Sequence, residues 1–153
     1  MIRQYKPEDL AQIMDIGNRA WREIYKMFKE TYGDELFQII VPDPETSKGK
    51  QIKWHCEEHP EWVFICEEEG QIVGFITVFL DEEKKIGTIG NNARDPECEL
   101  KGIGQQMYKA AFEYFREHGM VHAKVHTGLD YAHGPARKAY ERAGFNLSHK
   151  VVV

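Results

Sequence analysis

The periodicity of the apolar residues changes near residue 62, and this change constrains the fold more than any other feature. Before it the apolar spacing is helical, whereas WVFIC (residues 62–66) and QIVGFITVFL (residues 71–80) are runs rich in β-branched and aromatic residues. The EEEG segment between the two runs predicts a tight turn and an antiparallel hairpin. Helices followed by a hairpin, and then by a mixture of both, indicate an α+β or mixed α/β fold.

Further helices and strands are expected on both sides of this hairpin. Pro7, Glu8 and Asp9 predict a helix start, because proline suits the first turn and acidic residues suit its positive end. This helix continues to about residue 24, and further helices are expected at residues 34–40, from the 42–44 loop to about 58, and at 103–118 and 134–144. Further strands are expected at residues 85–96, 120–129 and 145–153, and Gly87 and Gly90 predict a bulge or a close backbone approach. No repeat or low-complexity linker interrupts the chain, so we expect a single domain over residues 1–153.

Composition excludes several classes of protein. The chain has 153 residues, 42% hydrophobic and 29% charged, which is typical of a soluble globular domain. No apolar run approaches the roughly 20 residues that span a bilayer, and the N-terminal segment lacks the pattern of a signal peptide. We therefore expect a cytoplasmic protein with no membrane partner. Cys56, Cys66 and Cys98 are an odd number without CxxC spacing, which indicates neither a disulfide framework nor a zinc site.

The charged residues are unevenly distributed along the chain. Residues 1–100 contain 12 Lys and Arg against 21 Asp and Glu, whereas residues 101–142 contain 7 against 4. A nucleic-acid-binding protein more often has a strongly basic face. We therefore expect no nucleic-acid partner and instead a small polyanionic ligand near residues 101–142, although these charges could equally serve to solvate surface helices.

The segment ELKGIGQQMYKAAFEYF (residues 99–115) places Gly102 and Gly104 where a helix begins. A helix N-terminus has four unpaired N–H groups and the positive end of the helix dipole. Glycines remove the side chains that would keep an anion away from those groups. With Lys101 beside them they predict a phosphate-binding loop, but glycine before a helix also occurs as ordinary turn chemistry, and the segment alone does not decide between the two.

Two motifs resemble those of the GNAT superfamily, the acyl-CoA-dependent N-acyltransferases. The pyrophosphate loop of that family has Arg or Gln, two residues, Gly, one residue, then Gly or Ala, and the corresponding window here is residues 99–104. A later family motif has an alanine, a tyrosine four residues on and a final Gly-Phe, which correspond to Ala136, Tyr140, Gly144 and Phe145. The resemblance covers residues 63–145 and implies a GNAT-like fold, with a central, mostly antiparallel sheet that has splayed middle strands and flanking helices.

The resemblance also implies a reaction. Acetyl-CoA would be the acyl donor, no metal would be needed, and the primary amine of a small molecule or peptide would attack the thioester directly. Tyr140 would protonate the leaving thiolate, with His126 and Asp130 as further candidate catalytic residues. The donor would enter between residues 86–94 and 121–127, where a backbone N–H would polarise the carbonyl. The implied cofactor-binding residues are Ala93, Arg94, Glu99, Leu100, Lys101, Gly102, Ile103, Gly104, Gln105, His133, Ala136 and Arg137, and the implied acceptor-binding residues are Trp21 and Tyr25. Asn91 is a further candidate for acceptor binding, because one of the two asparagines at the predicted bulge, Asn91 and Asn92, could hydrogen-bond the substrate.

Several of these residues have an alternative, structural interpretation. Tyr140 could be a core aromatic residue, His126 could be structural, and Asp130 could cap the helix that follows it. Trp21 and Tyr25, four residues apart, are equally compatible with a core. The acidic balance of residues 1–100 favours a cationic acceptor, because a negative cleft attracts a protonated amine.

The alternatives to an active acetyltransferase also stay open. Glu99 stands where the family has Arg or Gln, and Leu100 where glycine is common, which suggests a catalytically idle GNAT-fold module that binds CoA or a protein partner. A phosphate binder outside the superfamily would require the match at residues 136–145 to be accidental. Homodimers are common in the superfamily, so a homodimer is compatible with the resemblance.

Overall fold

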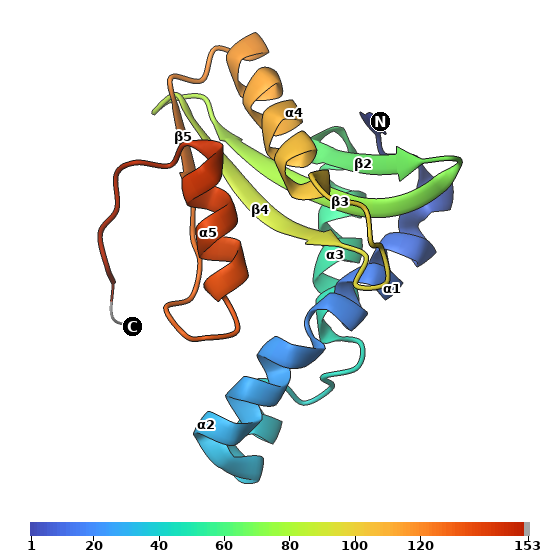
Figure 1. The fold of residues 1–153 in the computed structure, drawn as a ribbon, viewed down its shortest axis with the longest axis vertical. Coiled ribbons are helices and arrows are strands. Elements are labelled where there is room, and N and C mark those ends of the chain that lie inside the picture. The colour runs from blue at the N-terminus through green and yellow to red at the C-terminus, as the bar shows by residue number, and fades with distance from the viewer. Residues whose placement is uncertain (152–153) are drawn as a thin grey trace.

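The computed structural model describes residues 1–151 and has a five-stranded sheet in the order β1-β2-β3-β4-β5 (Figure 1). The strands are β1 (Ile2–Gln4), β2 (Val63–Glu68), β3 (Gln71–Asp81), β4 (Ile86–Arg94) and β5 (His122–Val125). Neighbouring strands are antiparallel from β1 to β4, and β5 runs parallel to β4. This arrangement confirms the predicted α+β fold with a mostly antiparallel sheet.

The helices cover both faces of the sheet. A short 3-10 turn, η1 (Pro7–Asp9), leads into α1 (Leu10–Ala20), and α2 (Arg22–Ile40), α3 (Ser47–Glu58) and the 3-10 turn η2 (Pro60–Trp62) follow. The later helices are α4 (Ile103–Glu117) and α5 (Gly134–Ala143). Figure 1 shows α4 and α5 on one side of the sheet, with α1 and α3 on the other. No helix within residues 1–151 is both long and apolar enough to cross a membrane.

Both faces of the central strands are buried, which explains their continuous apolar sequence. Ile76 and Val78 of β3 pack with Met107 of α4 in one cluster, whereas Phe75 packs with Ile13 of α1 and with α3 in another. Side chains alternate between the two faces of a strand, so one apolar run supplies both clusters. Of the three cysteines, Cys56 and Cys66 are buried thiols and Cys98 is half-buried.

Two sequence predictions about the elements were wrong, and one strand was missed. Strand β1 was not predicted; it has only three residues and is held by pairing, with Ile2 opposite Cys66. The helix expected at residues 34–40 is the end of α2, which begins at Arg22 and kinks at Gly33, where φ is 77°. Residues 145–151 form no strand, because α5 ends at Gly144 and the exposed segment after it pairs with no neighbour in the described chain; residues 152–153 of that predicted strand lie outside the described residues.

A β-bulge interrupts β4, as the glycines predicted. Ile76 pairs with Asn92 and Val78 pairs with Ile89, so Gly90 and Asn91 together stand opposite Thr77. A Cβ atom at Gly90 would lie 2.5 Å from the Thr77 hydroxyl oxygen, closer than the packing allows. The bulge turns the end of β4 and changes which of its side chains face each side of the sheet.

Candidate active site

The parallel pairing between β4 and β5 covers only part of β4. It runs from Ile86 with His122 to Ile89 with Val125, and β4 then continues to Arg94 without β5. Alternate backbone N–H and C=O groups after the bulge, at residues 91–94, point away from β3 and are open to a ligand. The Gly90 carbonyl oxygen differs, because it accepts a hydrogen bond from Asn92 Nδ2 at 3.1 Å. The two central strands are therefore splayed, as the resemblance implied.

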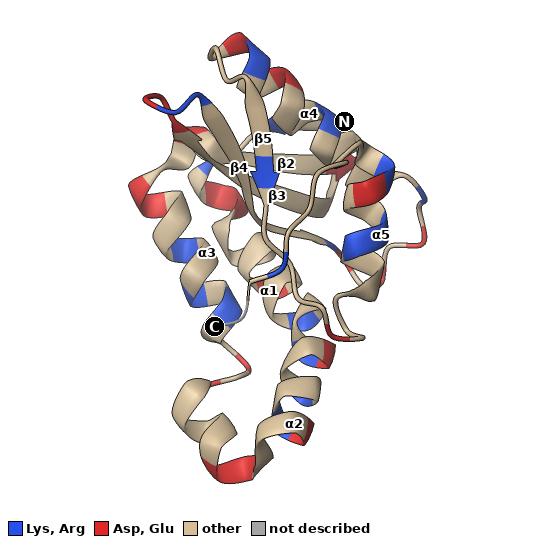
Figure 2. Cartoon of the chain, turned by 90° about the vertical axis from the view of Figure 1, so that its left-hand side faces the viewer, with Lys and Arg blue, Asp and Glu red and all other residues tan. Residues whose placement is uncertain are grey.

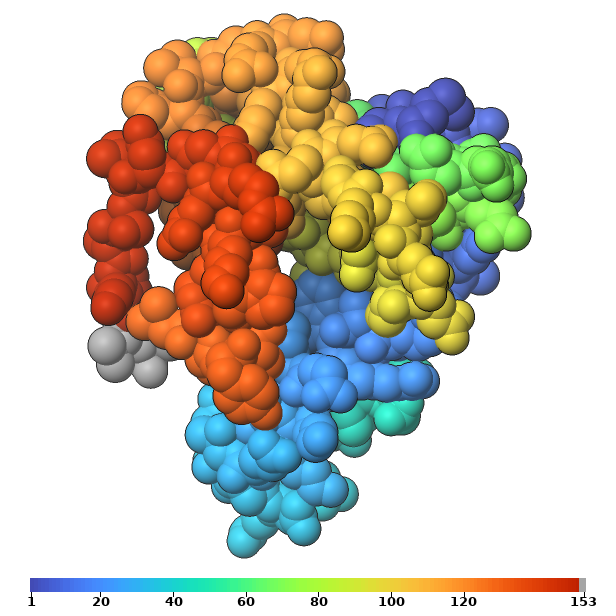
Figure 3. Space-filling view, viewed as in Figure 1, coloured from blue at the N-terminus to red at the C-terminus, as the bar shows by residue number. Residues whose placement is uncertain are grey.

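A cavity of about 750 Å³ lies at the splay, between α1, β4, the start of α4, the segment after β5, and α5. Figure 3 shows this face hollowed between orange-red α5, the yellow segment before α4 and the blue N-terminal helices. The predicted site residues that line it are Trp21, Asn91, Ala93, Arg94, Gly102, Ile103, Gly104, Gln105, His126, His133, Ala136 and Tyr140.

The remaining predicted site residues lie away from the cavity wall. Glu99, Leu100 and Lys101 are exposed on the loop before α4. Tyr25 is 7% exposed and packs with Phe37 and Val41 in a small cluster of its own. Asp130 belongs to the loop before α5 and Arg137 to α5 itself, and both are described below.

The start of α4 has no side-chain cap. Gly102, at the N-cap position, has φ 84° and ψ 0°, the left-handed conformation that favours glycine. Gly104 differs, because a Cβ atom there would meet only the Tyr108 ring, at an ordinary 3.7 Å. The backbone conformation thus favours glycine at position 102. At position 104 the backbone would accept a side chain, and glycine instead leaves free space in the cavity next to the unpaired N–H groups of the first turn of α4. Such N–H groups bind phosphate readily.

An ion pair anchors the loop that leads into α4. Arg19 of α1 donates two hydrogen bonds to the Asp95 carboxylate, at 2.7 and 2.9 Å, and a third to Asp15 at 2.8 Å. The Arg19 guanidinium lowers the pKa of the Asp95 carboxyl, although partial burial opposes this. This contact fixes the end of β4 against α1, next to the residues that line the cavity.

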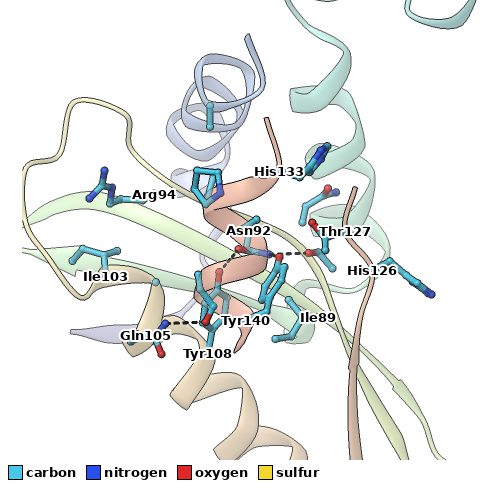
Figure 4. Close-up of a pocket in the computed structure, with 18 of the residues that line it drawn as sticks. Ile89, Asn92, Arg94, Ile103, Gln105, Tyr108, His126, Thr127, His133 and Tyr140 are labelled. Carbon is cyan, nitrogen blue, oxygen red and sulfur yellow. Dashed lines mark hydrogen bonds between the residues drawn. The ribbon is translucent and has the colours of Figure 1, made fainter. Parts of the chain in front are cut away.

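Tyr140 is held at the centre of the site by Asn92 and Tyr108 (Figure 4). Its hydroxyl oxygen accepts a hydrogen bond from Asn92 Nδ2 at 3.0 Å, and the Tyr108 hydroxyl donates to Asn92 Oδ1 at 3.1 Å. Burial raises the pKa of Tyr140, although the hydrogen bond from Asn92 opposes this. Within residues 1–151 no hydrogen bond uses the Tyr140 proton, so this neutral hydroxyl can donate into the cavity.

Tyr108 was not among the predicted site residues, and of the two adjacent asparagines Asn91 was predicted rather than Asn92. The bulge obscured Asn92, because an extra residue in β4 changes which of the two adjacent asparagines faces Tyr140. The available signal for Tyr108 was its position four residues after Gly104, which places both on one face of α4.

Hydrogen bonds from side chains stabilise the segment between β5 and α5. The Asp130 carboxylate accepts hydrogen bonds from the His133 backbone N–H at 3.0 Å and from His133 Nδ1 at 2.8 Å. Arg137 donates to the carbonyl oxygens of Gly128 and Asp130, at 2.6 and 2.7 Å. Partial burial disfavours the Asp130 charge, but the His133 hydrogen bonds outweigh it and lower the pKa of that carboxyl. Asp130 therefore orders the turn that leads into His133, the N-cap residue of α5.

His126 lines the cavity at the end of the β5 segment. In Figure 4 its ring points away from the Tyr140 hydroxyl. It is an exposed residue, and it directly follows Val125, which pairs with Ile89 just before the bulge of β4.

Lys48 of α3 is a buried cation that the sequence analysis did not select. Its Nζ donates to Gln51 Oε1 at 2.8 Å and to Asn91 Oδ1 at 3.1 Å, and lies 4.3 Å from the centre of the Trp21 ring. Lys48 is 8% exposed. Burial lowers its pKa to about 8. Since Asn91 and Trp21 line the cavity, Lys48 stands directly behind its wall.

Lys48 is expected to make the free energy of unfolding rise with pH between its folded pKa of about 8 and the ordinary value of 10.5. In that window the unfolded state binds more protons than the folded state, so stability increases with pH. One pKa unit corresponds to about 1.4 kcal/mol, so the whole rise is roughly 3 kcal/mol. Urea unfolding at a series of pH values would measure it, with Lys48→Met as the control that lacks this component. An identical pH dependence in both proteins would contradict the assignment.

The cavity wall is not acidic. Its charged and titratable members include Arg94, His126, His133 and Arg142, and no Asp or Glu is among the lining residues. Figure 2 shows acidic segments on outward turns of the helices and at the tip of the β3–β4 hairpin. The acidic residues of the first part of the chain therefore contribute no carboxylate to the wall of this cavity. Within residues 1–151 no three His, Cys, Asp or Glu side chains are grouped so that they could hold a metal ion.

Comparisons with known proteins agree with this geometry. The chain is 26% identical over 148 residues to YhfO, an uncharacterized N-acetyltransferase from Bacillus subtilis strain 168, covering 94% of this chain and 88% of that protein. Its fold is similar to that of PaiA N-acetyltransferase from Thermoplasma acidophilum in complex with coenzyme A, with a TM-score of 0.72, 15% identity, and coverage of 99% and 92% of the two chains. A GNAT family acetyltransferase from Brucella melitensis in complex with acetyl-CoA is also similar, with a TM-score of 0.64, 19% identity, and coverage of 96% and 82%.

The sequence profile of the acetyltransferase (GNAT) family matches residues 21–145. That span begins at Trp21 on one wall of the cavity and includes the splayed strands, the start of α4 and Tyr140. This chain therefore belongs to the GNAT family of acetyltransferases.

Proposed function

We propose that the protein transfers an acetyl group from acetyl-CoA to a primary amine of a small molecule or peptide. One observation carries this proposal: the unpaired end of β4, the open first turn of α4 and the Tyr140 hydroxyl all border one cavity. Direct transfer needs a donor site, a polarising group and a proton donor within reach of one thioester. The two relatives whose structures hold acetyl-CoA or coenzyme A support the choice of donor.

The donor would occupy the splay between β4 and β5. Its pantetheine arm would extend β4 by hydrogen bonding to the open backbone groups of residues 91–94, as an added strand does. Its pyrophosphate would bind the N–H groups at Gly102–Gly104, where the helix dipole favours an anion. The departures at Glu99 and Leu100 are compatible with this arrangement, since both side chains are exposed outside the cavity wall.

In the proposed reaction, the lone pair of the neutral amine forms a bond to the acetyl carbonyl carbon. A backbone N–H near Ala93 or Arg94 stabilises the negative charge that develops on the carbonyl oxygen. The C–S bond then breaks, the sulfur keeps the electron pair, and Tyr140 gives its proton to the thiolate. The raised pKa of Tyr140 suits this role, because the hydroxyl is protonated at neutral pH. The proton released by the amine passes to solvent or to His126.

The acceptor would enter from the side of the cavity opposite α5. Trp21 and Asn91 lie on that wall with Phe79, and they offer an aromatic surface and an amide. Tyr25 is buried elsewhere, so it would act only by supporting α2.

Calorimetric titration with acetyl-CoA and CoA, followed by thiol release over a panel of amines, tests the proposal. We expect acetyl-CoA to bind and thiol release to require an amine, with mass spectrometry detecting the acetylated product. Binding of CoA without amine-dependent release would support the alternative of an idle module. No binding at all would contradict both the donor site and the reaction.

A further inference from the structure

The position of Lys48 is defined by close packing between α1 and α3. The amide oxygen of Asn18 accepts a hydrogen bond from the Gly49 N–H at 2.7 Å, and a Cβ atom at Gly17 would lie 2.2 Å from Ile52. The start of α3 is therefore held against α1, and Lys48 points between Trp21 and Asn91. A lysine side chain fixed in this way is part of a built structure rather than a mobile surface group.

The charge of Lys48 has no counter-ion. Its Nζ contacts are two neutral amide oxygens, of Gln51 and Asn91, and the face of the Trp21 ring. Within residues 1–151 no carboxylate forms an ion pair with it. A buried charge without an opposite charge is destabilising, and a methionine of similar length would fill the same space at lower cost. An unpaired buried cation at this place therefore needs an explanation other than stability.

Two of its three contacts form part of the acceptor side of the cavity. Because Asn91 Oδ1 accepts from Lys48, the group of Asn91 that remains for a ligand is the Nδ2 donor. The cavity wall contains no Asp or Glu. A ligand group on this side thus meets the Asn91 Nδ2 donor, and directly behind that donor lies the positive charge of Lys48, which has no counter-ion. Charge interactions are strong there, because the environment of Lys48 is partly shielded from water.

We propose that Lys48 determines which acceptors are used: it selects an amine whose non-reacting end carries a carboxylate, and it disfavours an acceptor with a second ammonium group. Lys48 does so as a positioning residue, by presenting Asn91 Nδ2 toward the acceptor and by its charge behind Asn91 and Trp21. This inference rests on the proposed acetyl transfer and names its substrate class. It is opposite to the cationic acceptor that the charge balance of residues 1–100 suggested.

Three acceptors of matched length test this selectivity. 6-Aminohexanoate, hexylamine and 1,6-diaminohexane share the reacting primary amine and differ in the charge at the far end. For the native protein we expect kcat/KM to be highest for 6-aminohexanoate and lowest for 1,6-diaminohexane. In Lys48→Met the ratio between these two should fall at least tenfold, while acetyl-CoA affinity is unchanged. Lys48→Arg, which keeps the charge, should restore most of the preference.

The matched control is Lys53→Met, on the same helix. Lys53 is exposed and pairs with Glu57, so its removal changes the net charge equally without touching the cavity wall, and the acceptor ratio should stay native. Asn91→Asp provides a second variant in case Lys48→Met does not fold. It places a carboxylate beside Lys48 and should also lower the preference for 6-aminohexanoate.

The outcomes separate this inference from the proposed function. Thiol release with an unchanged acceptor ratio in folded Lys48→Met and in Asn91→Asp would overturn the role of Lys48 alone. Absence of thiol release with every amine would overturn the acetyl transfer. In that case, calorimetry can still test the role of Lys48, by measuring the affinity of each of the three amines for CoA-saturated protein. If the three amines rank in the same order of affinity for the native and Lys48→Met proteins, the role of Lys48 is overturned.

Discussion

Tyr140→Phe is expected to lower kcat for acetyl transfer by about 100-fold or more, the usual range for loss of a general acid. The variant removes the one proton near the departing sulfur, and it keeps the ring that packs 5.3 Å from Tyr108 and 5.9 Å from Phe145. Acetyl-CoA affinity should change little, because the hydroxyl acts on the leaving group. Single-turnover thiol release and calorimetric titration would measure the two quantities separately.

Tyr108→Phe is the matched control. It also deletes one buried tyrosine hydroxyl from this cluster, but that hydroxyl donates to Asn92 rather than into the cavity. Its effect on kcat should be much smaller, through a less well held Asn92. In the native protein kcat should also fall above the ordinary tyrosine pKa of about 10, because Tyr140 must be protonated and its pKa is raised further. Equal losses in both variants, or unaltered turnover in Tyr140→Phe, would rule out the general-acid role.

Gly104→Val is expected to weaken acetyl-CoA binding by at least tenfold, about 1.4 kcal/mol. The added side chain would stand on the cavity side of the first turn of α4, where the pyrophosphate would approach the N–H groups. Each hydrogen bond to a charged group contributes about 1.5–3 kcal/mol, so displacement from one or two donors accounts for the loss. Calorimetric titration of the variant with acetyl-CoA gives the dissociation constant directly.

The choice of Gly104 separates crowding of the ligand from damage to the fold. A side chain at Gly104 meets only the Tyr108 ring at ordinary contact distance, whereas one at Gly102 would be forced into a left-handed conformation at φ 84°. Gly104→Val should therefore melt close to the native temperature, and Gly104→Ala should bind with intermediate affinity. Native affinity in a folded Gly104→Val protein would place the phosphate elsewhere.

Local signals in the sequence were sufficient for the elements that local chemistry governs. The hairpin of β2 and β3, the helix that begins after Gly102 and the helix that ends at Gly144 all follow from apolar period and glycine position. The motif residues Gly104, Ala136 and Tyr140 were found because their spacing, along one helix or across one helix start, resembles that of the GNAT motifs. They line one cavity in the structure.

Elements that form only by pairing with residues distant in the sequence could not be predicted from such local signals. Strand β1 forms because its three residues pair with the edge of β2, at least 60 positions away in the sequence. Three residues are too few to show the alternation of apolar and polar side chains that predicts a strand. The expected C-terminal strand failed for the converse reason, since residues 145–151 have strand-like composition but no neighbour to pair with in the described chain.

The sequence by itself determined most of the order of the elements, the glycine-containing start of α4 and the position of Tyr140 in α5, because each depends on residues within a few turns of one another. The tertiary structure alone decided the rest of the site. It brings Asn92 to Tyr140 across 48 positions and Lys48 to Asn91 across 43, and it leaves no Asp or Glu among the residues that line the cavity. Electrostatics in a cleft depend on which charges are buried together, and burial arises only when distant segments pack.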